Sequence, residues 1–159
     1  MNKSDVLQSH QCEVGVVPVV RAASPEEAIQ VIEAIKTGGL SILEITMTVP
    51  RAVKVIEEVA SRYGDEVLVG AGTVLDAETA RDCIRAGANF VVSPSLNLQT
   101  IEFCLRESIA ESFPGALTPT GGSDRVGRLA PTPSRFSLVA RSGRQVSRFA
   151  QSAFARRSR

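Results

Sequence analysis

Five short apolar runs alternate with amphipathic segments between residues 14 and 118, and this alternation constrains the fold more than any other feature of the chain. The runs are rich in β-branched residues and cover 14–20, 40–46, 66–73, 90–94 and 113–118. Continuous apolar strands joined by helices are typical of a parallel sheet with right-handed crossovers, because both faces of each strand are covered. Units this short favour the amino-terminal half of a TIM (β/α)8 barrel, about five β/α units, over a doubly wound sheet.

The helices between these runs have clear start and stop signals. Ser24 provides a hydroxyl cap, Pro25 occupies the first helical position, Glu26 and Glu27 stand in the first turn, and Gly38-Gly39 ends the helix. The other helices are predicted to start at Pro50 and to cover 3–12, 76–86 and 98–106. This is the α/β class of fold.

Each predicted strand ends in polar residues or glycine, and the carboxyl ends of barrel strands converge on one mouth. The stretch 40–50 is the most informative, because the carboxylate of Glu44 lies within an otherwise apolar strand. Burying an unpaired carboxylate costs several kcal/mol, so such a group is either paired or used in chemistry. Arg21, at the end of the preceding strand, is the candidate ion-pair partner, and both interpretations stay open on the residues alone.

The composition is that of a globular protein, with 43% hydrophobic and 22% charged residues. No apolar run reaches the roughly 18 residues that a membrane span needs, and no signal-peptide core opens the chain, so no membrane partner and a cytoplasmic location are expected. The cysteines, Cys12, Cys83 and Cys104, have no C-x-x-C spacing. We therefore predict buried reduced thiols, with neither a disulfide framework nor a metal site.

The charge distribution divides the chain at about Thr120. Residues 1–120 carry a net charge of −7, whereas residues 121–159 carry nine Arg, one acid and a net charge of +8. The second part has no sustained hydrophobic period and is predicted to be an irregular, disordered Arg/Ser-rich tail. The alternative is a non-enzymatic α/β module that binds anions or nucleic acid through this tail, although the tail has no Lys and few aromatic residues. Salt-dependent binding that is lost when the tail is deleted would favour that alternative.

Residues 14–120 resemble the 2-keto-3-deoxy-6-phosphogluconate (KDPG) / 4-hydroxy-2-oxoglutarate aldolase family, which comprises class I aldolases on a TIM barrel. Each matching segment alone is weak evidence for the family, but the order and spacing of all the segments together are specific to it. The segments are Val17–Arg21, Gly38–Gly39, Leu43–Thr46, Gly70–Val74, Ala86–Ala88, Val92–Pro94 and Pro114–Thr120. Another barrel lyase or a phosphate-binding epimerase is a more distant alternative.

The resemblance implies a cofactor-free lyase that acts on a small 2-keto acid and assembles as a homotrimer, with no nucleic acid partner. A family lysine on the sixth strand forms a Schiff base with the substrate ketone, and the protonated imine accepts electrons during cleavage. The products are pyruvate and glyceraldehyde 3-phosphate, or pyruvate and glyoxylate from the hydroxy-oxoglutarate substrate.

The resemblance also implies roles for individual residues. Glu44 is the expected general acid/base, and a raised pKa from partial burial would suit it to proton transfer near neutrality. Arg21 and Thr73 are expected to bind substrate carboxylate or phosphate, and Pro94 to shape the pocket wall. Thr73 could equally belong to a helix-capping turn, and Pro94 to a plain turn. Many relatives have an arginine where this chain has Thr48, which leaves carboxylate binding to Arg21 and Thr73.

The Schiff-base lysine has no counterpart in this chain. The lysines are Lys3, near the amino terminus, and Lys36 and Lys54, both on predicted helices. The segment 129–138 is compatible with codons that encode Gly-Ala-Asp-Ala-Val-Lys-Val-Phe-Pro, the family's sixth-strand sequence, in another reading frame. We therefore expect a partial barrel domain over 1–120, a frameshifted tail over 121–159, and an inactive polypeptide.

Overall fold

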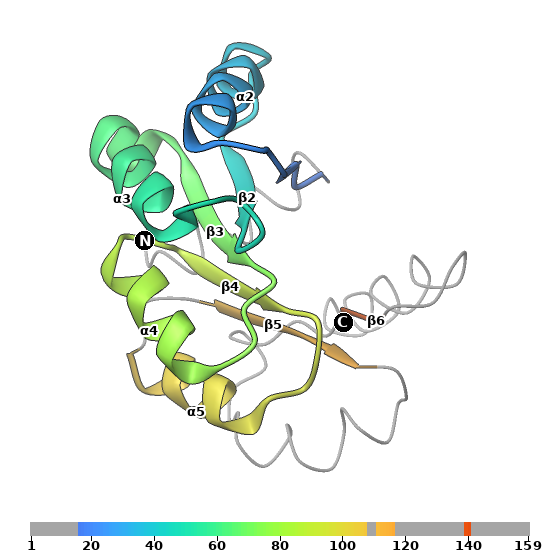
Figure 1. The fold of residues 1–159 in the computed structure, drawn as a ribbon. Helices are drawn as coiled ribbons and strands as arrows, with labels where there is room; N and C mark the ends of the chain where they lie inside the picture. Colours follow the sequence, from blue (N-terminus) through green and yellow to red (C-terminus); the bar gives the residue numbers. More distant parts are fainter. Residues whose placement is uncertain (1–15, 108–110, 117–138, 141–159) are drawn as a thin grey trace, which may run out of the picture.

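A computed structural model describes residues 16–107, 111–116 and 139–140 of the chain (Figure 1). Strands and helices alternate along the sequence as expected. The elements are β1 (Val19–Val20), α2 (Pro25–Thr37), β2 (Ile42–Thr46), α3 (Ala52–Tyr63), a 3-10 turn (Gly64–Glu66), β3 (Leu68–Gly72), α4 (Ala77–Arg85), β4 (Phe90–Ser93), α5 (Leu98–Glu107), β5 (Glu111–Ala116) and β6 (Val139–Ala140). The helix expected over 3–12 lies outside the described residues. No helix in the described ranges is both long and apolar enough to cross a membrane.

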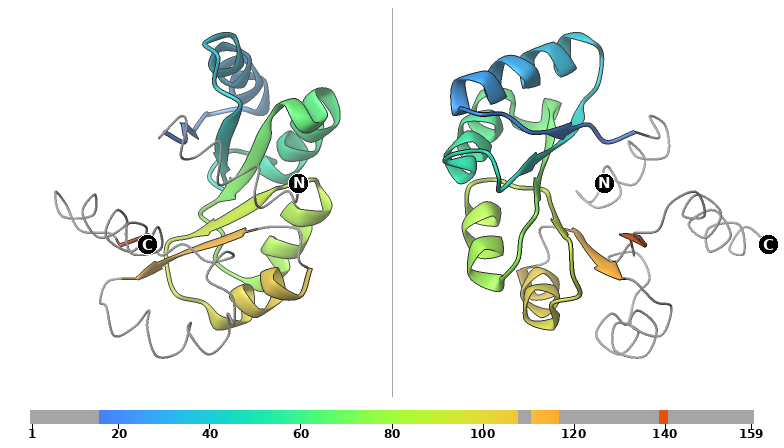
Figure 2. Two further views of the ribbon diagram at one scale, coloured as in Figure 1. Left: turned by 180° about the vertical axis from the view of Figure 1, so that it is seen from behind. Right: turned by 45° about the vertical axis from the view of Figure 1, so that its right-hand side comes forward.

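The strands form one parallel sheet in the order β1-β2-β3-β4-β5-β6. Helices α2 to α5 cover the same side of this sheet, and the strands twist progressively from β1 to β5 (Figures 1 and 2). Sequential parallel strands with all their helices outside are the arrangement of a barrel wall rather than a doubly wound sheet, in which helices cover both faces.

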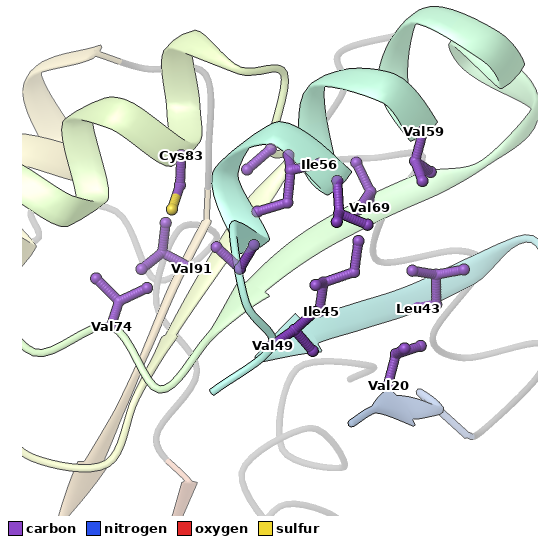
Figure 3. Packing of buried hydrophobic residues seen from close by; sticks show 14 of the residues in the cluster. Val20, Leu43, Ile45, Val49, Ile56, Val59, Val69, Val74, Cys83 and Val91 are labelled. Atoms are coloured by element: carbon purple, nitrogen blue, oxygen red, sulfur yellow. The ribbon is translucent and has the colours of Figure 1, made fainter. Parts of the chain in front are cut away.

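The larger hydrophobic core lies between the sheet and the helices. Every second residue of β2 and β3, such as Leu43, Ile45 and Val69, points toward the helices, where Ile56 and Val59 of α3 meet them (Figure 3). The side chains on the opposite face form a smaller cluster that consists of Ile42, Leu68, Phe90 and Phe113. The rings of Phe90 and Phe113 meet edge to face, with centroids 5.6 Å apart. This second cluster lies on the face that a closed barrel would enclose.

Local capping chemistry sets the helix ends. The Ser24 hydroxyl accepts a hydrogen bond from the Glu27 amide at 3.1 Å, and the Asp76 carboxylate accepts one from the Thr79 amide at 2.7 Å. Gly38 caps α2, as the sequence predicted. The start of α3 differs: a turn follows β2, Arg51 adopts a left-handed φ of 54°, and the helix begins at Ala52 instead of Pro50.

Two strands also differ from their predicted bounds. Of the described residues in the expected strand 14–20, only Val19 and Val20 form β1, because only these pair with β2. β5 begins at Glu111, two residues before the predicted start, since it pairs with the whole of β4. Within the tail, Val139–Ala140 form a short strand beside Gly115 and Ala116, where no strand was predicted.

Candidate functional site

The polar residues predicted at the strand ends follow four neighbouring strands of the sheet. Arg21 comes after β1, Glu44 lies within β2, Thr73 follows β3 and Pro94 follows β4. Because these strands are parallel and adjacent, their carboxyl ends lie along the same edge of the sheet. The topology therefore places Arg21, Thr73 and Pro94 at this edge and Glu44 two residues before the end of β2, and the four residues differ in how they are held.

Glu44 is the ionisable group that the fold holds most closely. Its side chain lies against Gly72 of β3, where a Cβ would come within 2.5 Å of the Glu44 Cδ and 2.7 Å of its Cγ. The residue is partly buried, and burial raises the pKa of its carboxyl above the usual 4.5, while the positive charge of Arg21 acts in the opposite direction. A raised pKa makes a carboxylate a stronger proton acceptor than an exposed one, which suits it to general acid/base chemistry.

Arg21 is exposed and acts on Glu44 only at a distance. The ion pairs in the described part of the chain join other residues, so the proposed structural pair between Arg21 and Glu44 is not formed there. The positive charge of Arg21 still lowers the pKa of the Glu44 carboxyl, against the effect of burial. A guanidinium that is not engaged by this carboxylate retains its donors for another oxyanion.

Thr73 has an unusual backbone conformation. Its φ is 61°, in the left-handed region that a β-branched residue rarely adopts. The next residue is tied to the end of β4, because the Val74 amide donates to the Val92 carbonyl at 3.1 Å and the buried Ser93 hydroxyl donates to the Val74 carbonyl. The backbone on the far side of Thr73 is held as well, since the Gly72 carbonyl accepts from the Met47 amide at 2.8 Å. Strain that is over-determined by its surroundings in this way is common at functional sites.

Pro94 is exposed at the end of β4. Its carbonyl oxygen lies where a Cβ at Gly115 would approach it to 2.5 Å, so this backbone packs closely against β5. This packing is compatible with both sequence interpretations, a pocket wall and a plain turn.

Three features of the site were not predicted from the sequence. The hydroxyls of Thr46 and Thr48 are hydrogen-bonded to each other at 2.5 Å at the end of β2, and Ser93 holds the backbone next to Thr73. At Gly70 and Gly72, side chains from neighbouring strands fill the space that a Cβ would take: the Phe90 ring lies over Gly70 and the Glu44 carboxylate over Gly72. Two glycines at alternate positions of a strand, beside a strand with a carboxylate, were the available signal.

The described lysines and cysteines lie elsewhere. Lys36, in the last turn of α2, forms an ion pair with Glu66 at 2.7 Å and lies 4.3 Å from the centroid of the Tyr63 ring, while Lys54 is exposed on α3. Cys83 and Cys104 are buried thiols, as predicted, and burial raises the pKa of Cys83 to about 12 and that of Cys104 to about 11. Cys12 lies outside the described residues.

A parallel wall of strands with external helices, and with polar groups along its carboxyl edge, is the amino-terminal half of an α/β-barrel enzyme. A family model described as "KDPG and KHG aldolase" matches residues 7–122. The chain belongs to this family, and the fold class and family expected from the sequence are confirmed.

Individual relatives agree with this membership. The chain is 37% identical over 107 residues to the 2-dehydro-3-deoxy-phosphogluconate aldolase of Treponema pallidum, a match that covers 67% of this chain and 50% of the relative. It is 38% identical over 81 residues to the KHG/KDPG aldolase of Escherichia coli K12, covering 51% of this chain and 38% of the relative. The chain thus spans half or less of the length of these curated relatives.

A crystal structure of the KDPG aldolase from Legionella pneumophila, with pyruvate captured as a covalent carbinolamine intermediate, superposes with a TM-score of 0.64 at 30% sequence identity. The match covers 70% of this chain and 53% of that one. The matched part is therefore a half barrel of the aldolase fold.

Proposed function

We propose that the carboxyl edge of β1 to β4 is the amino-terminal half of a class I aldolase active site. The observation that carries the proposal is Glu44, a partly buried carboxylate with a raised pKa near the end of a core strand. In this role Glu44 moves protons as the carbinolamine forms and as the carbon–carbon bond breaks. Arg21 and Thr73 bind the carboxylate or phosphate oxygens of the substrate, and Pro94 contributes to the pocket wall.

The proposed reaction is retro-aldol cleavage of a 2-keto acid. The names of the relatives support 2-keto-3-deoxy-6-phosphogluconate, which yields pyruvate and glyceraldehyde 3-phosphate, and 4-hydroxy-2-oxoglutarate, which yields pyruvate and glyoxylate. The carbinolamine with pyruvate in the Legionella enzyme supports pyruvate as the part of the substrate that is held covalently. The homotrimer and the cytoplasmic location stay predictions from the family.

We further propose that this polypeptide is inactive, because it lacks an amine in the position that imine formation requires. Lys36 is paired with Glu66 at the carboxyl end of α2, and a helix that leads into β2 ends near the strand's amino end, opposite the site. Lys54 lies on the surface of α3, and Lys3 falls outside the described residues. A general acid without the imine nitrogen has no carbinolamine on which to act.

The proposed cause is a shift of reading frame after about residue 120. With one permitted choice of codons, the alternative frame of 129–138 would encode the family's sixth-strand sequence, and its lysine would overlap the codons of Ser134 and Arg135. The nucleotide sequence is the direct test of this hypothesis. If no one- or two-base change restores Val-Lys-Val-Phe-Pro, the hypothesis is wrong.

Borohydride trapping with pyruvate tests the activity proposal. We expect no covalent adduct on the 159-residue chain, and an adduct on the chain whose frame has been restored by one or two bases. The Legionella aldolase serves as the positive control for trapping. A clean adduct on the 159-residue chain would overturn the proposed inactivity, and none on the restored chain would overturn the proposed aldolase function.

A further inference from the structure

The position of the Glu44 carboxylate depends on a residue in the neighbouring strand. In the register of the sheet, Glu44 is opposite Gly70 and Thr46 is opposite Gly72. The Glu44 side chain therefore leans along the strand toward the carboxyl edge, and it ends over Gly72 instead of its direct partner. There it occupies the volume that a side chain on Gly72 would fill: an added Cβ would overlap Oε1 and lie 2.5 Å from Cδ.

Gly72 is not needed for its backbone freedom. Its φ lies outside the left-handed region, so any L-residue could adopt this backbone. It is the last residue of β3, it is paired with Thr46, and its carbonyl accepts from the Met47 amide at 2.8 Å, so its backbone is held in place. A side chain at position 72 could therefore be accommodated only if the Glu44 carboxylate moved away.

We propose that Gly72 is a positioning residue, whose missing side chain provides the place in which the Glu44 carboxylate is held at the carboxyl edge of the sheet. The proposal deepens the function proposed above, on which the catalytic role of Glu44 rests. The physical claim about position is independent of that role. Gly72 acts only through Glu44 and is not itself a catalytic residue.

Gly70 provides a matched comparison within the same strand. It lies two residues before Gly72 and faces the same side of the sheet, and a Cβ there would come within 2.5 Å of Cδ2 of the Phe90 ring. Its backbone is likewise outside the left-handed region. A Gly70→Ala substitution therefore creates overlap of the same kind, but the three atoms nearest to the added Cβ all belong to the apolar Phe90 ring and none to the carboxylate.

The test is a double-mutant cycle on the full 159-residue chain, in which the melting temperature Tm of each variant is measured. We expect the effect of Gly72→Ala on Tm to differ between the wild-type and the Glu44→Ala backgrounds, because the overlapping carboxylate is absent from the second. Gly70→Ala should lower Tm to the same extent with and without Glu44→Ala. Since Gly72→Ala is also measured in the Glu44→Ala background, a destabilised single variant does not prevent the comparison.

A second measurement follows the carboxyl group itself. In an NMR titration of the Glu44 side chain, Gly72→Ala should move its pKa toward the ordinary value, because the displaced carboxylate is more exposed to water. Gly70→Ala should leave that pKa unchanged. Equal losses of Tm from Gly72→Ala in both backgrounds would overturn the proposal, as would an unchanged pKa of Glu44 in Gly72→Ala. Neither measurement uses turnover, so a failure of the aldolase assignment would appear only in the trapping experiment.

Discussion

Glu44 makes the stability of the fold depend on pH. Burial raises the pKa of its carboxyl in the folded state above the usual 4.5, so the folded protein binds the proton more tightly than the unfolded chain does. The contribution of this group to stability is therefore greatest below the unfolded pKa and decreases as the pH rises through the folded pKa. At neutral pH the ionised carboxylate destabilises the fold.

Glu44→Gln should accordingly increase the free energy of unfolding at pH 7, since a neutral amide replaces a partly buried charge. The advantage should decrease as the pH is lowered below 4.5, where the wild-type carboxyl is protonated in both states. Urea denaturation of both proteins at the two pH values measures this difference. A variant that is less stable than wild type at pH 7 would contradict the burial argument.

Thr73 is the second residue whose proposed role in the functional site conflicts with the stability of the fold. Thr73→Gly should stabilise the fold by about 1 kcal/mol, because a left-handed φ costs a β-branched residue more than glycine loses in chain entropy. Denaturant titration measures the gain. Gly64→Thr is a comparison in the opposite direction, because Gly64 has open space around it but a φ of 52° and a ψ of −128°, which L-residues avoid, and it should destabilise the fold by at least as much. A loss of stability in Thr73→Gly would instead mean that the threonine side chain makes stabilising contacts.

At the scale of elements, the stability of the helices depends on capping residues that can be identified from the sequence. The Ser24 hydroxyl accepts from the Glu27 amide, and the Glu27 carboxylate accepts from the Ala23 amide at 2.8 Å, so the start of α2 is held from both sides. Ser24→Ala should lower the free energy of unfolding by about 1 kcal/mol, because an orphan helix amide loses its acceptor. Ser24→Asp keeps an acceptor and should retain most of the stability in the same measurement. A cost as large for Ser24→Asp would show that the hydroxyl has another role.

Hydrophobic periodicity alone does not determine where each strand begins and ends. Apolar runs predicted β2 closely, because its five residues pair in register with all of β3. The apolar runs overestimated the length of β1, since only two of its described residues pair with β2. The bounds of β5 follow from its pairing with β4, and Pro114 within it is typical of an edge strand, since proline cannot donate a ladder hydrogen bond.

At the scale of the whole molecule, the described part of the sheet leaves barrel edges incompletely paired. β6 pairs only with Gly115 and Ala116, at the carboxyl end of β5. Exposed strand edges are templates for intermolecular pairing. We expect the purified chain to aggregate as its concentration rises, as measured by light scattering, so the stability comparisons belong in dilute solution. A chain that stays monomeric at high concentration would contradict this expectation.

The candidate site could be predicted only in part from the sequence. Glu44 could be identified because a carboxylate in an apolar strand is costly, and Thr73 only through the resemblance to the aldolase family. The sequence did not reveal that Arg21 leaves Glu44 unpaired, since that depends on side-chain positions on two strands. It also did not reveal the hydrogen bond from Ser93 to the Val74 carbonyl, which joins the ends of β3 and β4.

The sequence by itself determined the order of the elements, their parallel arrangement, the caps of α2 and α4, and the membership of an aldolase family. These properties depend on local periodicity and on chemistry between residues a few positions apart. Only the tertiary structure decided that Glu44 lies over Gly72, that Thr73 is held in a left-handed conformation, and how far β1 and β5 extend. Each of these depends on contacts between residues distant in the chain, which the register of neighbouring strands brings together.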